Sequence, residues 1–179
     1  MLLSAGAPVS GAVVQETPYF TLRSAPSNRI VGPGQRFTLA LDFDLRDGLH
    51  AYAPGAHAYR PLTVRLDAHQ RVASVPAAVF PEPKSYVFKP LKETVPTYQG
   101  RFRVLQDVVM KDVAVGWAQE FLDAPDRYEP VVLTGTLEYQ LCSDTICYPP
   151  GQLPLRFELK LRPKDEVRAR PELRRPVAR

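Results

Sequence analysis

The sequence contains few of the residues that build metal sites, and it lacks the long apolar run of a membrane span. Its 179 residues include two cysteines, three histidines and one tryptophan. A structural zinc site needs four ligands, and two cysteines separated by four residues do not have a typical zinc spacing. No stretch approaches the roughly 20 apolar residues that a transmembrane helix needs. Basic and aromatic residues do not interleave, so nucleic-acid binding is not predicted.

Proline and positive charge are in excess. There are 19 prolines against 10 glycines, and proline suits turns, edge strands and loops better than helices. Residues 162–179 hold seven Lys or Arg and three Asp or Glu, which accounts for the whole formal charge of +4. We therefore expect a basic, solvated tail over residues 163–179. The apolar residues 1–17 are expected to be a disordered leader or the remnant of an export signal.

Apolar and polar residues alternate along several short segments, which is the period of a half-buried strand. The clearest examples are residues 36–44 and 153–161, and the pattern recurs in residues 62–66 and 131–142. No segment has a sustained helical period. The pattern predicts an all-β fold, a β-sandwich over residues 18–162. Its last two strands should form a hairpin with the two cysteines at the tip.

The two cysteines, Cys142 and Cys147, suggest a reactive disulfide more than an architectural one. A bond between them would close a ring of six residues, which stabilises a fold by only about 2 kcal/mol in the chain-entropy model. Reversible thiol–disulfide exchange is the use that we favour. A purely structural disulfide and metal binding by the pair are the alternatives. Asp144, between the cysteines, fits a turn residue and also a carboxylate that raises a neighbouring thiol pKa.

Three segments of the sequence resemble a known family. Tyr139, Gln140, Cys142 and the run of residues 147–150 are similar to the motif of the N-terminal periplasmic domain of DsbD, a bacterial transmembrane protein that conducts reducing equivalents. Residues 47–52 resemble the aromatic Asp-Gly strand near that family's active site. Residues 84–89 lie where the family carries a cap loop. We expect the surrounding charged and proline-rich residues 82–92 to be an exposed loop.

The resemblance implies an immunoglobulin-like domain exported to the periplasm, with any membrane association supplied by a partner. It implies an oxidoreductase component of the protein-disulfide reductase type. The domain would receive electrons from a thioredoxin-like donor. It would pass them to a disulfide isomerase or a cytochrome-maturation-type thiol acceptor. No cofactor is expected for this exchange. The alternative from another class is a non-catalytic binding or adaptor module with a structural disulfide.

The resemblance also assigns site residues. Either Cys142 or Cys147 would form the mixed disulfides with donor and acceptor, and the other would resolve them. The resemblance favours Cys147 as the sulfur that attacks and is attacked. The cap aromatic would be Tyr86 or Phe88, of which Phe88 is preferred. The remaining candidates border the cysteines: Tyr148 as a modulating residue beside Asp144, and His50, Tyr52, His57 and Tyr59 as a possible rim of the site.

Overall fold

The alternation of apolar and polar residues produces long strands with one buried face. The structure is a computed structural model that describes residues 12–56, 59–88, 93–112 and 128–163. These residues form strands and connecting segments, with no helix in the described ranges. In β4 (Arg36–Leu45) every second residue from Phe37 to Leu45 is buried. The alternation predicted for residues 153–161 is equally regular in β13 (Gly151–Leu161), although Leu153 is only half-buried.

One wall of the molecule is an antiparallel sheet of five strands in the order β1-β2-β4-β10-β7. Its longest pairing joins β4 to β10 in continuous register, from Asp44 opposite Arg101 to Arg36 opposite Val109. The other strands of this sheet are β1 (Val13–Glu16), β2 (Phe20–Pro26), β7 (Val72–Ser74) and β10 (Arg101–Met110).

The opposite wall is a sheet of four strands in the order β3-β13-β11-β6. Its centre is the antiparallel hairpin of β11 and β13, which pairs from Glu129 opposite Leu161 to Tyr139 opposite Gly151. This hairpin confirms the predicted pairing of the last two strands. The remaining strands are β3 (Ile30–Val31), which runs parallel to β13, β6 (Thr63–Leu66) and β11 (Glu129–Tyr139).

The two walls enclose one hydrophobic core, which makes the fold the predicted immunoglobulin-like sandwich. Each wall contributes the buried residues of its long strands. Burial of each large apolar side chain contributes about 1.5–3 kcal/mol. The largest fully buried members of this core are Phe20, Leu22, Val31, Leu39, Leu41, Val104, Met110, Leu137, Leu141 and Leu155.

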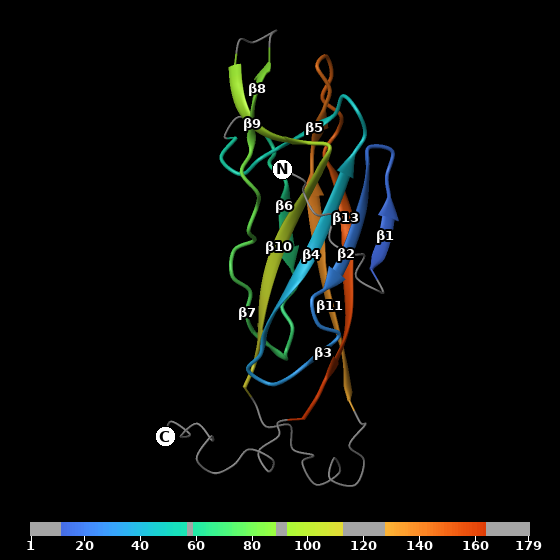
Figure 1. Ribbon diagram of the computed structural model, residues 1–179, viewed down its shortest axis with the longest axis vertical. Coiled ribbons are helices and arrows are strands. Elements are labelled where there is room, and N and C mark those ends of the chain that lie inside the picture. The colour runs from blue at the N-terminus through green and yellow to red at the C-terminus, as the bar shows by residue number, and fades with distance from the viewer. Residues whose placement is uncertain (1–11, 57–58, 89–92, 113–127, 164–179) are drawn as a thin grey trace, which may run out of the picture.

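A third, smaller sheet covers one end of the molecule in the order β12-β5-β9-β8. The connection between β11 and β13, drawn in orange, reaches the same end (Figure 1). This connection contains β12, so the cysteine segment belongs to the third sheet as well as to the hairpin tip. The strands are β5 (His50–Tyr52), β8 (Lys84–Phe88), β9 (Glu93–Gln99) and β12 (Leu141–Cys142).

The third sheet is joined to the sandwich by two glycines with left-handed backbone conformations. Gly48 (φ 78°) lies between β4 and β5, and Gly100 (φ 59°) lies between β9 and β10. Below the glycines β4 pairs with β10, and beyond them β5 pairs with β9, so one ribbon of two strands passes from the sandwich into the third sheet. Glycine adopts positive φ without the steric cost that a Cβ brings. The two glycines therefore permit the bend that carries β5 toward the cysteines.

The prediction of an exposed loop over residues 82–92 is wrong for residues 84–88, which form a strand. Residues Lys84–Phe88 form β8, which pairs with β9 in register from Lys84 opposite Thr97 to Phe88 opposite Glu93. Tyr86, Val87 and Phe88 are residue types that favour strands. The neighbouring prolines lie outside these five residues, so they bound the strand rather than prevent it.

The predicted ends of the domain are only partly within the described residues. Within the expected leader, residues 1–17, the segment Val13–Glu16 forms β1 and pairs with β2. Residues 1–11 and the basic tail from residue 164 onward lie outside the described ranges. The expected single strand over residues 131–142 ends at Tyr139, and Leu141–Cys142 crosses to the third sheet.

Substitution of Gly100 tests the bend. A Cβ at this position would meet no heavy atom of the described residues within 4 Å, so any cost of a larger residue is conformational. We expect Gly100→Val to lower the free energy of unfolding by about 1–2 kcal/mol. Gly100→Asn should cost less, because Asn adopts positive φ more readily. The measurement is urea unfolding of both variants beside the unmodified chain, and equal losses would contradict the backbone explanation.

Candidate functional site

The cysteines face each other across a short hairpin turn. Cys142 and Cys147 form an isolated antiparallel bridge, and a disulfide joins their sulfur atoms. The Ser143 amide donates a hydrogen bond to the Ile146 carbonyl over 2.8 Å, and the Ile146 amide donates to Ser143 Oγ over 3.1 Å. These bonds close the turn and leave Asp144 at its exposed tip. Because the sulfurs are bonded to each other, the oxidised pair offers no thiolate to a metal.

Tyr148 and Gln140 fasten the turn to the strands below it. The Tyr148 amide donates to the Leu141 carbonyl over 2.9 Å, and Gln140 Nε2 donates to the Tyr148 carbonyl over 3.2 Å. The Tyr148 ring lies 4.8 Å from the Tyr19 ring, measured between centroids. The structure thus places Tyr148, predicted as a modulating residue, in the support of the cysteine turn. Its ring packs on Tyr19, the residue that precedes β2.

The two cysteines have opposite exposures. Cys142 is wholly buried, at 0 % exposed, because it lies on β12 against β5. Cys147 is exposed, and so is its neighbour Ile146. An attacking thiolate must reach a sulfur along the line of the S–S bond, so access decides which sulfur reacts. The exposed residue is Cys147, the sulfur that the resemblance assigns to attack.

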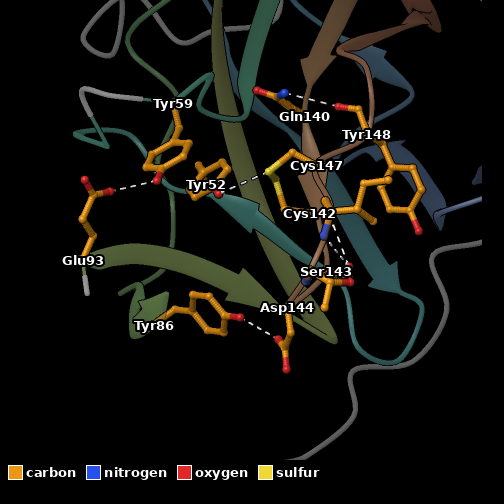
Figure 2. The surroundings of a disulfide bond; sticks show 12 residues. Tyr52, Tyr59, Tyr86, Glu93, Gln140, Cys142, Ser143, Asp144, Cys147 and Tyr148 are labelled. Atoms are coloured by element: carbon orange, nitrogen blue, oxygen red, sulfur yellow. Dashed lines mark hydrogen bonds between the residues drawn. A yellow bond between two sulfur atoms is a disulfide. The ribbon is translucent and has the colours of Figure 1, made fainter. Parts of the chain in front are cut away.

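Tyr52 contacts the exposed cysteine from the third sheet. Its Oη lies 3.7 Å from Cys147 Sγ, and Figure 2 shows it beside the disulfide. The disulfide sulfur carries no hydrogen, so the tyrosine hydroxyl is the donor. Burial, with smaller contributions from Tyr59, Tyr86 and Glu93, raises the pKa of Tyr52 to about 12. The hydroxyl therefore stays protonated at neutral pH and can donate to a sulfur that gains negative charge.

Tyr59 and Glu93 support Tyr52 from behind. The Tyr59 ring stacks on the Tyr52 ring at 4.1 Å between centroids, and its hydroxyl donates to Glu93 Oε2 over 2.8 Å. This hydrogen bond raises the pKa of Tyr59. Glu93 is a site residue that the sequence analysis missed. Nothing local marks it, because its role depends on how β9 lies against the segment that carries Tyr59.

Tyr86 reaches the cysteine turn from β8. Its hydroxyl donates to Asp144 Oδ1 over 2.6 Å (Figure 2), and this hydrogen bond is the main reason why the pKa of Tyr86 rises to about 12. The structure therefore joins two predicted candidates, the cap aromatic Tyr86 and the turn carboxylate Asp144. Phe88 lies on the same strand, but its side chain is outside the described part of the chain.

His50 is buried among the aromatic rings. It lies directly opposite Cys142 in the pairing of β5 with β12. Its ring lies 4.2 Å from the Tyr86 ring and packs edge-on to the Tyr52 ring at 5.5 Å. Burial lowers the pKa of His50, and the negative charge of Asp144 opposes this only in part. His57, the other histidine predicted near the site, lies outside the described residues.

The arrangement defines a class of protein. It is an immunoglobulin-like sandwich with a disulfide at a hairpin tip, one cysteine exposed and the other buried. This is the geometry of a thiol–disulfide interchange domain. The family described as "Thiol:disulfide interchange protein DsbD, N-terminal" matches residues 21–158, and the chain belongs to that family.

A solved structure has the same fold. The crystal structure of the N-terminal periplasmic domain of ScsB from Proteus mirabilis matches with a TM-score of 0.56 and 13 % sequence identity. The match covers 84 % of this chain and 52 % of the ScsB chain, so this chain spans about half the length of that domain. No curated protein sequence matches the chain. In the described residues, no helix has the length and apolar character to cross a membrane.

Alkylation of single-cysteine variants tests the difference in exposure. We expect the Cys147 thiol in Cys142→Ser to react with iodoacetamide at least about tenfold faster than the Cys142 thiol in Cys147→Ser, because reaction requires an accessible thiolate. The measurement is the rate of mass increase at fixed pH. The control is the same reaction in about 8 M urea, which unfolds most small proteins. Both thiols should then react at similar rates. Equal rates in the folded variants would contradict the assigned asymmetry.

Proposed function

We propose that this chain passes reducing equivalents from a thioredoxin-like donor to oxidised protein disulfides in the periplasm, through reversible opening of the Cys142–Cys147 bond. The observation that carries this proposal is the pairing of an exposed Cys147 with a buried Cys142 within one six-residue ring. So short a ring adds little to the stability of the sandwich. The bond can therefore open and close while the core stays folded.

The chemistry needs only thiols and disulfides. A donor thiolate attacks Cys147 Sγ, the Cys142 sulfur leaves, and a mixed disulfide forms. The second donor cysteine then attacks the donor sulfur of that bond, which releases reduced Cys147 and an oxidised donor. In the forward transfer, the Cys147 thiolate attacks an acceptor disulfide and Cys142 resolves the new mixed disulfide. Two electrons move in each half of the cycle.

Tyr52 would assist whichever step leaves charge on Cys147. Its hydroxyl already points at that sulfur over 3.7 Å and stays protonated at neutral pH. A hydrogen bond to an ionised acceptor is about twice as strong as one to a neutral acceptor. The contact therefore gains strength when the disulfide opens and Cys147 becomes a thiolate.

The family and the ScsB domain support the proposed location and partners. The matched structure is titled a periplasmic domain, and we infer the same compartment for this chain. An oxidising compartment suits a protein that carries a disulfide. The donor is expected to have a thioredoxin-like dithiol, and the acceptor to be a disulfide isomerase or a cytochrome-maturation-type thiol protein.

Tyr86 would serve as the cap of the site. Its hydrogen bond to Asp144 fastens the β8–β9 hairpin to the tip of the cysteine turn. While the bond is formed, the Tyr86 ring also lies over His50 at the buried side of the disulfide. A docking partner would have to break the hydrogen bond between Tyr86 and Asp144. The cap would therefore slow the reaction with small thiols, and the reaction with the proper acceptor would proceed once that acceptor has docked.

The equilibrium of the pair with glutathione tests the exchange function. We expect a reduction potential between about −270 and −180 mV, the range of dithiols that exchange with protein partners. The measurement is the fraction of alkylated protein in glutathione buffers, read by mass. Cys142→Ser and Cys147→Ser should each abolish transfer to an oxidised isomerase while melting as cooperatively as the unmodified chain.

A potential below about −300 mV, with slow reduction of the folded protein, would contradict exchange and indicate a structural bond. The chain would then be better described as a binding or adaptor module. Unfolding of both serine variants at room temperature would point the same way, because a six-residue ring that merely exchanges should contribute only about 2 kcal/mol.

Two substitutions on β8 test which aromatic is the cap. We expect Tyr86→Phe to speed alkylation of the reduced pair about fivefold, because a lost hydrogen bond of about 1 kcal/mol favours the open cap by that factor. Tyr98→Phe is the matched control, since its hydroxyl binds the Pro81 carbonyl instead. The sequence favoured Phe88 for this role. A faster rate in Phe88→Ala, with no change in Tyr86→Phe, would assign the cap to Phe88.

A further inference from the structure

His50 is a buried polar side chain that none of the exchange steps above uses. It is 1 % exposed, and its Nε2 atom has no hydrogen-bond partner among the described residues. A buried nitrogen without a hydrogen-bond partner destabilises the folded state. Such a cost is expected where the atom has a role in another state of the protein. The state missing here is the reduced one, in which the cysteines carry protons.

The strand pairing places His50 beside the buried cysteine. Cys142 and His50 are directly opposite in the antiparallel pairing of β12 with β5. Directly opposite residues project from the same face of a sheet, with Cβ atoms about 4.5–5.5 Å apart. An imidazole and a thiol at that separation are within reach of a shared proton. Cys147, by contrast, has the Tyr52 hydroxyl as its polar neighbour.

Cys142 needs a proton acceptor more than Cys147 does. Its side chain is wholly buried, packed with Tyr52, Ala56 and Val95. Burial in apolar surroundings disfavours a thiolate, and only the thiolate attacks a disulfide. Resolution of a mixed disulfide on Cys147 would therefore be slow if the Cys142 thiol had to lose its proton to water.

We propose that His50 is the general base for Cys142, a role that rests on the proposed exchange function. With an acceptor sulfur bonded to Cys147, the Cys142 sulfur attacks Cys147 Sγ and its proton passes to Nε2 of His50. The Cys142–Cys147 bond forms, the bond from Cys147 to the acceptor breaks, and the acceptor sulfur leaves as a thiolate. The pair loses two electrons and the acceptor disulfide gains them. The imidazolium then loses the proton to the acceptor thiolate or to water, so His50 is neutral again in the oxidised protein. When a donor thiolate opens the bond, the departing Cys142 sulfur takes up a proton from water and becomes a thiol.

The charges around His50 suit this role. Tyr52 and Tyr86 contact its ring, and Asp144 is the carboxylate that acts on it electrostatically. Gln99 lies opposite it on β9, and Arg46 and Asp47 line the cavity that the histidine borders. Burial outweighs Asp144 and lowers the pKa of His50. The imidazole is therefore neutral at pH 7, as a base must be before it accepts a proton.

The test follows the two thiols separately with an aromatic disulfide reagent, 5,5′-dithiobis(2-nitrobenzoate), and the reduced full chain. Attack by Cys147 releases one thionitrobenzoate in a phase that depends on reagent concentration. Resolution by Cys142 releases a second in a phase that does not. Cys142→Ser is the control and should show the first phase alone. The readouts are the second-phase rate constant from pH 5 to pH 10 and the ratio of the second-phase to the first-phase rate constant at pH 7.

We expect the second phase of the unmodified chain to be level above the pKa of His50 and to fall at lower pH, where the imidazole is already protonated. In His50→Gln the ratio at pH 7 should fall about 100-fold, the lower range of general-base catalysis. The second-phase rate constant of His50→Gln should then rise about tenfold per pH unit as Cys142 ionises without help. The two proteins should converge at high pH.

Three results would contradict the proposal or the function beneath it. A second phase in His50→Gln with the unmodified pH profile would remove the base role. If His50→Gln fails to fold, the unmodified chain decides alone, and a second phase that rises steadily with pH, without a level region, also removes that role. An unmodified chain that releases no thionitrobenzoate while folded would contradict the exchange function itself, and the role of His50 with it.

Discussion

The pairing of β12 with β5 is the interaction on which the rest of the site depends. It involves only Leu141 opposite Ala51 and Cys142 opposite His50. Through it one cysteine is buried in a sheet, while the other returns along the exposed side of the turn. Cys142 and Cys147 are the same residue type, but they thereby acquire different solvent access and different polar neighbours. The proposed roles, attack by Cys147 and resolution by Cys142, rest on that difference.

The sandwich could be predicted because its signal is local. The alternation in β4 and β13 is written in consecutive residues, and the cysteine pair marks the hairpin tip between the last two strands. The third sheet could not be predicted in the same way. β8 is short and flanked by prolines, and it is a strand only because β9 pairs with it. A propensity for strands in residues 84–88 was outweighed in the sequence by charge and proline.

The site shows the same limit. The sequence offers its cysteines, Asp144, Tyr86, Tyr52 and His50 as candidates, but it does not predict their contacts. The hydrogen bond from Tyr86 to Asp144 joins residues 58 positions apart, and Glu93 binds Tyr59 across 34. That His50 Nε2 lacks a hydrogen-bond partner among the described residues can be seen only when the neighbours of the ring are known. Residue types reveal which chemistry is available, whereas pairing decides which groups share it.

The two tyrosine–carboxylate hydrogen bonds both involve the β8–β9 hairpin. Tyr86 lies on β8 and Glu93 on β9, so each contact joins the same hairpin to a different part of the molecule: the cysteine turn in one case, and the segment that carries Tyr59 in the other. A displacement of the hairpin that breaks one hydrogen bond also strains the other. The contacts therefore form a cooperative unit, and a partner that separates one of them makes the second easier to separate.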